Sequence, residues 1–247
     1  MFIILSPAKN MQSSRLEGLT LSRPRFLAQT EQLVETLRKF SPWQLERPMS
    51  VNPDLALKAF DSFQSFDPDA EGTAALLAYH GLQYRNLDPQ SFSLADFAFA
   101  NDHLRLLSAF YGVLRPTDGI LPYRLEFLCK LKFGGQNLYQ FWGNLLYRDL
   151  FSSGKTVINL ASAEYSRTVQ PYLTPHDRFL TCNFLVMKRG KPRTLATAAK
   201  IARGRMARYI VKEQIDDPEG LKDFCWNGYT FIPHLSDEST YTFLQRE

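Results

Sequence analysis

The 247-residue sequence contains few of the side chains that form disulfides or hold transition metals. Its three cysteines lie far apart with no CxxC pair, and its four histidines show neither HxH nor HxxxH spacing. This pattern argues against a disulfide framework and a zinc site, and a stable iron site would lack its usual His and Cys ligands. We therefore expect no metal and no cofactor. The apolar neighbours of Cys129, Cys182 and Cys225 predict buried, unpaired thiols.

Signals for membrane insertion and for the best-known catalytic families are also missing. No run of about 18 apolar residues occurs, so no membrane span is expected. The N-terminal stretch MFIILSPAKN lacks the basic and long apolar regions of a signal peptide, and we expect a cytoplasmic protein. The sequence has no GxSxG motif, no P-loop and no Cys/His pair within a motif. The residues therefore leave open whether the chain is an enzyme.

The composition indicates a sizeable hydrophobic core, because 45% of the residues are hydrophobic and 13% are aromatic. A formal net charge of +4 permits anionic partners without requiring them. Strand and helix patterns follow one another irregularly, without a βαβ period, which favours the α+β class. Strands are expected at 2–6, 155–160, 179–187, 229–231 and 241–244, and helices at 24–40, from 42 onward, 53–63, 73–87, 93–110, 137–151 and 194–214.

The segment 103–126, HLRLLSAFYGVLRPTDGILPYRLE, combines large apolar residues with several arginines and two turn signals. Its arginines, Arg105, Arg115 and Arg124, outnumber its carboxylates, Asp118 and Glu126. A buried cation without a partner costs several kcal/mol, so each arginine needs an anion. A bound phosphate-bearing ligand is favoured for at least one arginine. An internal salt-bridge network at a chain crossing is the alternative.

Other candidate residues lie just beyond strand ends and on the long helix. Lys9 follows the strand at 2–6, and Ser162 follows the strand at 155–160, so both are expected at one edge of a sheet. Arg203 projects at the margin of the apolar stripe of the helix at 194–214, and the adjacent Gly204 suggests close approach of a backbone or a ligand. We expect one positively charged cleft, lined by Lys9, Arg115, Arg124, Asn159, Ser162 and Arg203.

Six motifs in order make the sequence resemble the YaaA family of bacterial peroxide-stress-resistance proteins. They are ILSPAK (4–9), the segment 103–126, LYQFWG (138–143), VINLASAEY (157–165), AKIARGRMARYI (199–210) and NGYTF (227–231). The resemblance covers nearly the whole chain. It implies one compact α+β domain over 1–247 with a mixed sheet and many helices, and a helix–hairpin–helix element at about 73–110. It also implies binding to double-stranded and distorted DNA, and a role in limiting free intracellular iron when hydrogen peroxide rises.

The sequence departs from the family pattern at 80–87, where the family usually has GDVYxGL. Here HGLQYRNL keeps Gly81 and Tyr84 but has Leu82 in place of the aspartate and Asn86 in place of the second glycine. Helix–hairpin–helix modules bind phosphate through backbone N–H groups of a glycine-bearing hairpin. If this segment flanks the hairpin, the lost glycine and the added Arg85 change the affinity or the preferred substrate shape.

Two function classes follow. The first is a protective protein that binds duplex or branched DNA without sequence specificity through a basic cleft. The second is an enzyme that acts on a nucleotide-like small molecule in the same cleft, with Glu164 or Glu126 as general acid or base. An ion-pair role is the alternative for these carboxylates. The candidate DNA- or phosphate-binding residues are Lys9, Arg105, Arg115, Arg124, Asn159, Ser162, Lys200, Arg203 and Arg208.

Overall fold

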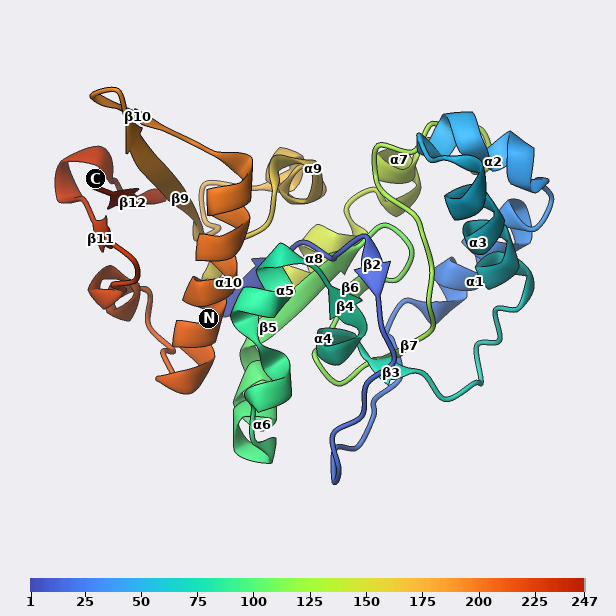
Figure 1. The fold of residues 1–247 in the computed structure, drawn as a ribbon, viewed down its shortest axis with the longest axis horizontal. Coiled ribbons are helices and arrows are strands. Elements are labelled where there is room, and N and C mark those ends of the chain that lie inside the picture. The colour runs from blue at the N-terminus through green and yellow to red at the C-terminus, as the bar shows by residue number, and fades with distance from the viewer. Residues whose placement is uncertain (247) are drawn as a thin grey trace.

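The computed structural model describes residues 1–246 and is built around an eight-stranded mixed sheet (Figure 1). Five neighbouring strands, in the order β12, β9, β8, β1 and β5, run parallel to one another. Strands β6, β10 and β11 pair antiparallel with β5, β9 and β12. The strands are β1 (Phe2–Leu5), β5 (Leu104–Ser108), β6 (Gly112–Leu114), β8 (Val157–Asn159), β9 (Phe179–Lys188), β10 (Lys191–Arg193), β11 (Tyr229–Phe231) and β12 (Thr240–Gln245). The expected α+β class is confirmed.

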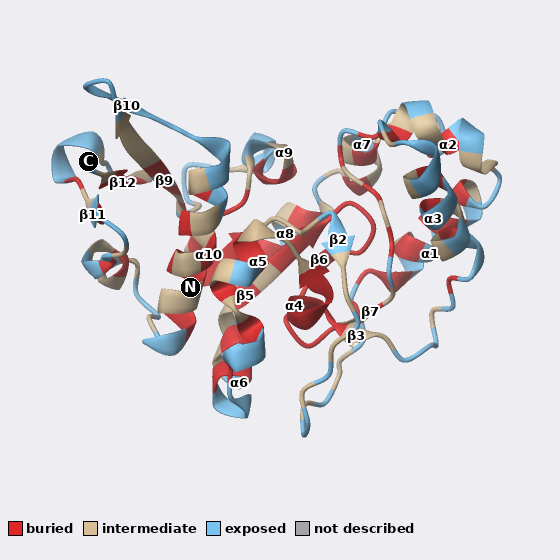
Figure 2. Cartoon of the chain, in the orientation of Figure 1, coloured by how far each residue is buried: buried red, intermediate tan, exposed pale blue. Residues whose placement is uncertain are grey.

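The central strands are those with the most continuous apolar sequence. Strand β1 reads FIIL, and all four of its residues are buried between β5 and β8. Strand β8 reads VIN and is also buried throughout. A parallel strand covered on both faces is expected to be apolar at every position, not at alternate positions. Figure 2 shows this buried core in the central strands, whereas the turn before β10 is exposed.

Helices and four short strands surround the sheet. The helices are α1 (Leu27–Leu37), α2 (Pro42–Met49), α3 (Pro53–Gln64), α4 (Ala75–Ala78), α5 (Leu82–Leu87), α6 (Leu94–His103), α7 (Leu138–Trp142), α8 (Leu145–Phe151), α9 (Ala163–Ser166) and α10 (Ala196–Lys212). The short strands are β2 (Asn10–Met11), β3 (Thr73–Ala74), β4 (Tyr79–His80) and β7 (Gly119–Ile120), paired as β2–β4 and β3–β7. Single 3-10 turns occur at Pro89–Ser91, Gln170–Tyr172, Pro218–Asp223 and Pro233–Leu235. In Figure 1, α1 to α3 form one lobe and the C-terminal strands form the other.

Three of the predicted helices are wrong over part of their length. The segment 73–87 is split into β3, α4, β4 and α5, because two strand pairings replace helical hydrogen bonds and Gly81 adopts an extended backbone. The helix predicted at 93–110 ends at His103, where the chain turns into β5 and pairs with β1. The helix predicted at 137–151 is interrupted at Gly143, whose φ of 48° and ψ of −129° do not continue a helix.

The helix–hairpin–helix expectation falls on the first two of these segments. Within 73–110, α5 and α6 follow each other, separated by the 3-10 turn Pro89–Ser91. The turn sequence DPQSFS contains no glycine, unlike a phosphate-binding hairpin. Ser93 caps α6 as expected: its side chain accepts from the backbone N–H of Asp96, and the Asp96 carboxylate accepts from the backbone N–H of Ser93.

Helix α10 packs closely on α5, which fixes one wall of the site described below. A Cβ atom on Gly204 would lie 2.1 Å from the carbonyl oxygen of Gln83, a distance that no side chain tolerates. The glycine at this position therefore marks close approach of another backbone, one of the two explanations that the sequence offered. The contact places the side chains of neighbouring α10 residues beside those of α5.

Candidate functional site

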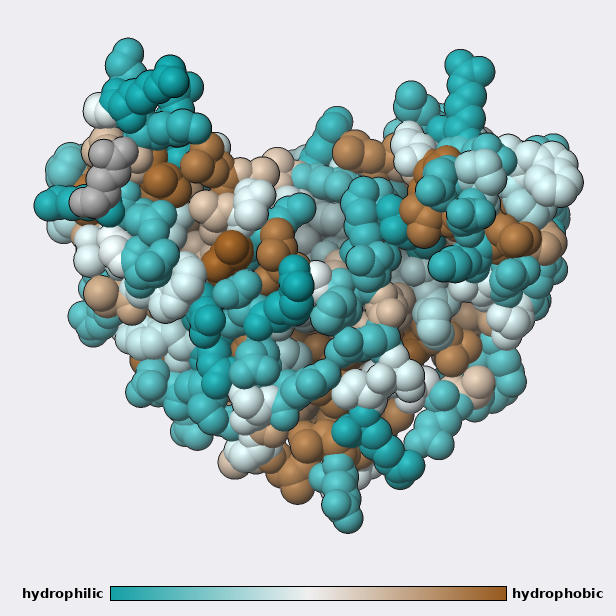
Figure 3. All heavy atoms as spheres, in the orientation of Figure 1, coloured by the Kyte–Doolittle hydropathy of each residue, from teal (hydrophilic) through white to brown (hydrophobic). Residues whose placement is uncertain are grey.

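A cleft of about 320 Å³ lies where the carboxyl ends of β1 and β8 meet. Its wall is formed by 6–10 after β1, by 80–84 at β4 and α5, by 123–126, by 162–165 after β8, and by two residues of α10. In Figure 1, α5 lies beside α10 and α9 lies above them, and the space-filling view in Figure 3 shows the surface indented between the two lobes. Ligand sites of sheets with parallel strands commonly occupy this edge.

The two loops that follow β1 and β8 are joined by hydrogen bonds at the base of the cleft. The Ser162 backbone N–H donates to Ser6 Oγ at 2.8 Å, and the Ser6 hydroxyl donates to Ser162 Oγ at 3.3 Å. The Tyr84 hydroxyl donates to the Ser6 carbonyl at 2.9 Å, which links α5 to the same loop. Asn159 is buried and accepts from the Ala161 backbone N–H at 3.0 Å. The cleft therefore has a pre-organised floor.

Glu126 holds two cations in the lining of the cleft. Its Oε2 atom lies 3.0 Å from Lys9 Nζ, and its Oε1 atom lies 3.0 Å from Arg124 Nε. The second contact is an ion pair by distance, but its angle is not that of a hydrogen bond. The side chains of Arg124 and Glu126 are 16% and 21% exposed, whereas Lys9 is 66% exposed. Glu126 therefore forms the ion pairs that the sequence offered as its alternative role, and most of the Lys9 side chain remains exposed to solvent.

Glu164 is the second carboxylate of the cleft lining. Burial raises the pKa of Glu164, and the nearby negative charge of Glu126 raises it further. The Leu128 backbone N–H donates to Glu164 Oε1 at 3.3 Å and Lys9 lies near, and both oppose the rise in pKa without cancelling it. A carboxyl group with a raised pKa beside cations is suited to moving protons or to accepting N–H groups.

In the part of the lining formed by α5 and α10, two buried donors have no acceptor. The Nε atom of Arg203 and the Nε2 atom of Gln83 are buried and make no hydrogen bond within residues 1–246. Arg203 forms no ion pair in this part of the chain, and burial lowers the pKa of its guanidinium. Gln83 as a whole is 8% exposed. Buried polar groups in folded proteins almost always have partners, so this pair is poised for a ligand.

A buried hydroxyl network lies under the cleft wall. The Tyr123 hydroxyl lies 2.7 Å from that of Tyr79 and 2.8 Å from Ser108 Oγ. Ser108 Oγ also accepts from the backbone N–H groups of Phe110 and Tyr111. Burial raises the pKa of Tyr123 to about 12, so this phenol stays protonated at neutral pH. The network fixes the segment that carries Arg124 and Glu126.

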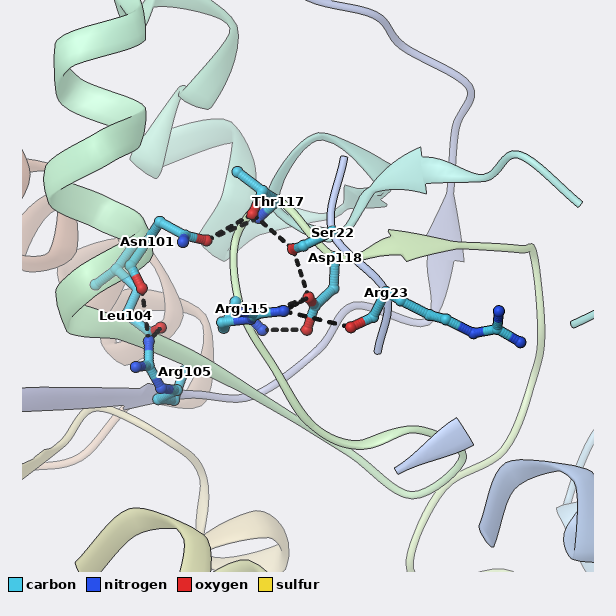
Figure 4. A network of polar contacts seen from close by, with 8 residues as sticks. All are labelled: Ser22, Arg23, Asn101, Leu104, Arg105, Arg115, Thr117 and Asp118. Carbon is cyan, nitrogen blue, oxygen red and sulfur yellow. Dashed lines mark hydrogen bonds and ion pairs between the residues drawn. The ribbon is translucent and has the colours of Figure 1, made fainter. Parts of the chain in front are cut away.

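The arginines of the segment 103–126 do not share one environment. Arg115 binds the fully buried Asp118 through two side-chain hydrogen bonds of 3.0 and 3.1 Å, and Ser22 donates to the same carboxylate at 2.7 Å (Figure 4). Arg105 donates to the carbonyls of Asn101 and Leu104 and lies over the ring of Phe2. The salt-bridge alternative thus applies to Arg115, which pairs with Asp118 outside the cleft wall, and also to Arg124, which pairs with Glu126 within that wall.

The structure brings together Lys9, Arg124, Ser162, Lys200 and Arg203 in the cleft wall. Of the six residues expected to share the cleft, Arg115 and Asn159 are not in its wall. Asn159 instead holds the turn before Ser162 and donates to Thr181 at 3.3 Å. Arg208 donates to the carbonyls of Leu87 and Asp88 and pairs with the Asp88 carboxylate, so it joins α10 to the end of α5.

Three features of this region were not predicted from the sequence. Gln83 was not singled out, because an isolated glutamine carries no motif. The sequence also did not show that the unpaired donors come from α5 and α10 while the carboxylates come from α9 and the segment 123–126. The third is the β9–β10 turn, KRGKPR at 188–193, a run of four exposed cations that sequence alone can reveal. In the sequence this run joins a predicted strand to a predicted helix, where an exposed turn is expected in any case.

The cysteines are free, but only Cys129 and Cys182 are buried; Cys225 is exposed, contrary to expectation. Cys225 lies just before β11, where the chain runs along the surface, so its apolar neighbours do not cover it. Within residues 1–246, no group of three or more His, Cys, Asp or Glu side chains is arranged to hold a metal ion. In the same residues, no helix has both the length and the apolar character needed to span a membrane.

Comparison with known proteins agrees with the resemblance seen in the motifs. A family model described as "Peroxide stress protein YaaA" matches residues 1–235. A UPF0246 protein of Clostridioides difficile is 39% identical over 246 residues, which cover 99% of this chain and 100% of that protein. A UPF0246 protein of Lactobacillus johnsonii is 42% identical over 242 residues, covering 98% and 96% of the two chains. The chain therefore belongs to the YaaA family of peroxide stress proteins.

Proposed function

We propose that this protein acts in the response to hydrogen peroxide by binding duplex or distorted DNA without sequence specificity. Family membership supports the stress role. The resemblance to the family also implies a lowering of free intracellular iron, which we include in the proposal. The observation that carries the DNA-binding part is the basic turn 188–193, whose chain continues directly into the helix that supplies Lys200 and Arg203 to the cleft.

The cations of the basic turn repel one another when no anion is bound to the protein. Lys188 and Lys191 are directly opposed in the β9–β10 ladder, and Arg189 and Gly190 form the turn with φ of 52° and 69°. Like charges directly opposite each other in an antiparallel pair destabilise it. No ion pair within residues 1–246 involves Lys188, Arg189, Lys191 or Arg193. An external polyanion would relieve this repulsion, as DNA phosphates do.

The salt dependence of DNA binding tests the proposal. Fluorescence anisotropy with a labelled duplex gives the affinity at several salt concentrations, and each phosphate contact contributes about −0.9 to the slope of log K against log salt. The double variant Arg189→Ala/Lys191→Ala should bind more weakly and lower the steepness of that slope by roughly 1.8.

A matched control separates a local contact from an effect of net charge. Lys39→Ala/Lys58→Ala removes the same charge from exposed positions in the lobe of α1 to α3. It should leave the slope close to that of the wild type. The proposal would be contradicted if the two double variants lost the same amount of DNA affinity, or if the wild-type affinity for DNA did not change with salt concentration.

A second candidate function is an enzyme that acts on a nucleotide in the cleft. The observation that favours it is the raised pKa of Glu164 beside Glu126 and Lys9. Incubation of the purified protein with deoxynucleotides, followed by chromatography, tests for a chemical change. If wild-type protein changes the nucleotides and Glu164→Gln does not, the reaction takes place in the cleft. If wild-type protein leaves the nucleotides unchanged, DNA binding remains the proposed function.

A further inference from the structure

The cleft is too small to hold a DNA duplex, the partner in the proposed function. A space of about 320 Å³ lies at the lower end of the range of roughly 300–1,000 Å³ for small-molecule pockets. A DNA duplex, whose major groove alone is about 12 Å wide, does not fit inside it. The contacts that a duplex makes with the basic turn therefore leave the interior of the cleft unused.

The interior is nevertheless built to bind an anion. Nε of Arg203, on α10, and Nε2 of Gln83, on α5, belong to cleft-lining residues and are buried, and neither has an acceptor within residues 1–246. Lys200 lines the same wall, one helical turn before Arg203. A guanidinium, an amide and an ammonium group suit the several oxygens of a phosphate group.

Two other segments of the lining can accept hydrogen bonds. Glu126, in the segment 123–126, and Glu164, in α9, contribute carboxylate oxygens, and Leu82, Tyr84 and Leu125 also line the cleft. The lining carries four cations, Lys9, Arg124, Lys200 and Arg203, against these two carboxylates. The surplus of positive charge matches a phosphomonoester, which carries close to two negative charges at neutral pH.

We propose that the cleft binds one nucleoside monophosphate, with its phosphate at Arg203 and Gln83 and the amino or imino groups of its base at Glu164. The nucleotide is either free or the phosphorylated end of a DNA strand. This inference deepens the proposed function by naming the ligand of the same site. The inference rests on the proposed DNA binding only if the bound nucleotide is the phosphorylated end of a DNA strand.

Isothermal titration of the full chain with dAMP tests the inference. dAMP should bind more tightly than deoxyadenosine or inorganic phosphate, because each of these makes only half of the contacts. Arg203→Met keeps the side-chain length but removes the donors, and should weaken dAMP about tenfold or more. Gln83→Leu should weaken it by several fold. Lys58→Met, in α3, removes an exposed cation and should have no effect.

Competition with DNA identifies the source of the nucleotide. If dAMP displaces a single strand with a 5′-phosphate but not the same strand with a 5′-hydroxyl, the ligand is a strand end. If it displaces neither, the ligand is a free nucleotide.

Three results would overturn the inference: no binding of dAMP, equal binding of phosphate alone, or unchanged affinity in Arg203→Met and Gln83→Leu. Failure of dAMP to bind, with salt-dependent duplex binding intact, would reject this inference and leave the proposed function standing. Binding of dAMP without any duplex binding would reject DNA binding and retain the nucleotide site.

Discussion

Removal of the Arg203 guanidinium should stabilise the folded protein while impairing its binding site. Arg203 is partly desolvated, its Nε is buried without an acceptor, and no carboxylate pairs with it within residues 1–246. A buried donor without a partner costs about 1–3 kcal/mol, and an unpaired charge adds to that cost. Methionine fills a similar space with no polar group.

The expected gain is at the lower end of this range, about 1 kcal/mol, because Arg203 is only partly buried. For a chain of this size, 1 kcal/mol corresponds to a rise in Tm of roughly 2–4 °C. Differential scanning calorimetry of wild type and Arg203→Met in low-phosphate buffer measures the difference directly.

Arg208→Met is the matched control on the same helix. Arg208 donates to two carbonyls and to Ser91, and pairs with Asp88. Its removal leaves acceptors without a donor and should lower the free energy of unfolding by about 1–2 kcal/mol. The two variants should therefore shift Tm in opposite directions. A fall in Tm for Arg203→Met equal to that for Arg208→Met would refute the reasoning, because it would give Arg203 a structural role.

Three further predictions concern the surroundings of the cleft. Because the pKa of Glu164 is raised in the folded state, the folded protein keeps this proton at pH values at which the unfolded chain has lost it. Protonated Glu164 therefore stabilises the fold at low pH, and this contribution is lost as the pH rises through the folded-state pKa. The Tm of wild type should consequently fall relative to that of Glu164→Gln between about pH 4 and 7, and a constant difference would contradict this. Gly204→Ala should push α10 away from α5 and lower the free energy of unfolding by about 1–3 kcal/mol, as measured by urea denaturation; an unchanged midpoint would show that the helices separate freely. In the native protein one thiol, Cys225, should react rapidly with a thiol reagent while the other two react only on unfolding, and modification of two or more at once would show that the core is open.

The location of Lys9 and Ser162 at one edge of the sheet was predictable from the sequence, because it requires only that two parallel strands are neighbours. The apolar runs at 2–6 and 155–160 indicated buried strands, and polar residues directly after such strands meet when the strands are parallel neighbours. Lys9 and Ser162 were placed by this argument. Arg203 followed from helical periodicity and from the neighbouring Gly204.

The remaining parts depend on tertiary contacts that a local pattern does not encode. Arg115 and Arg124 each pair with a carboxylate two or three residues further along the chain, but tertiary packing places only Arg124 in the cleft wall. The change from helix to strand after His103 was hidden because Leu104–Ser108 is short and its extended form is stabilised by pairing with β1 and β6.

Mapping the DNA contact surface by photocrosslinking tests the central claim most directly. A duplex carrying a photoreactive base is crosslinked to the full chain at low salt, and the modified peptides are identified by mass spectrometry. The account predicts crosslinks in peptides from the basic turn 188–193 and from the first half of α10. Crosslinks confined to the lobe of α1 to α3, or none under conditions where the duplex is bound, would contradict it.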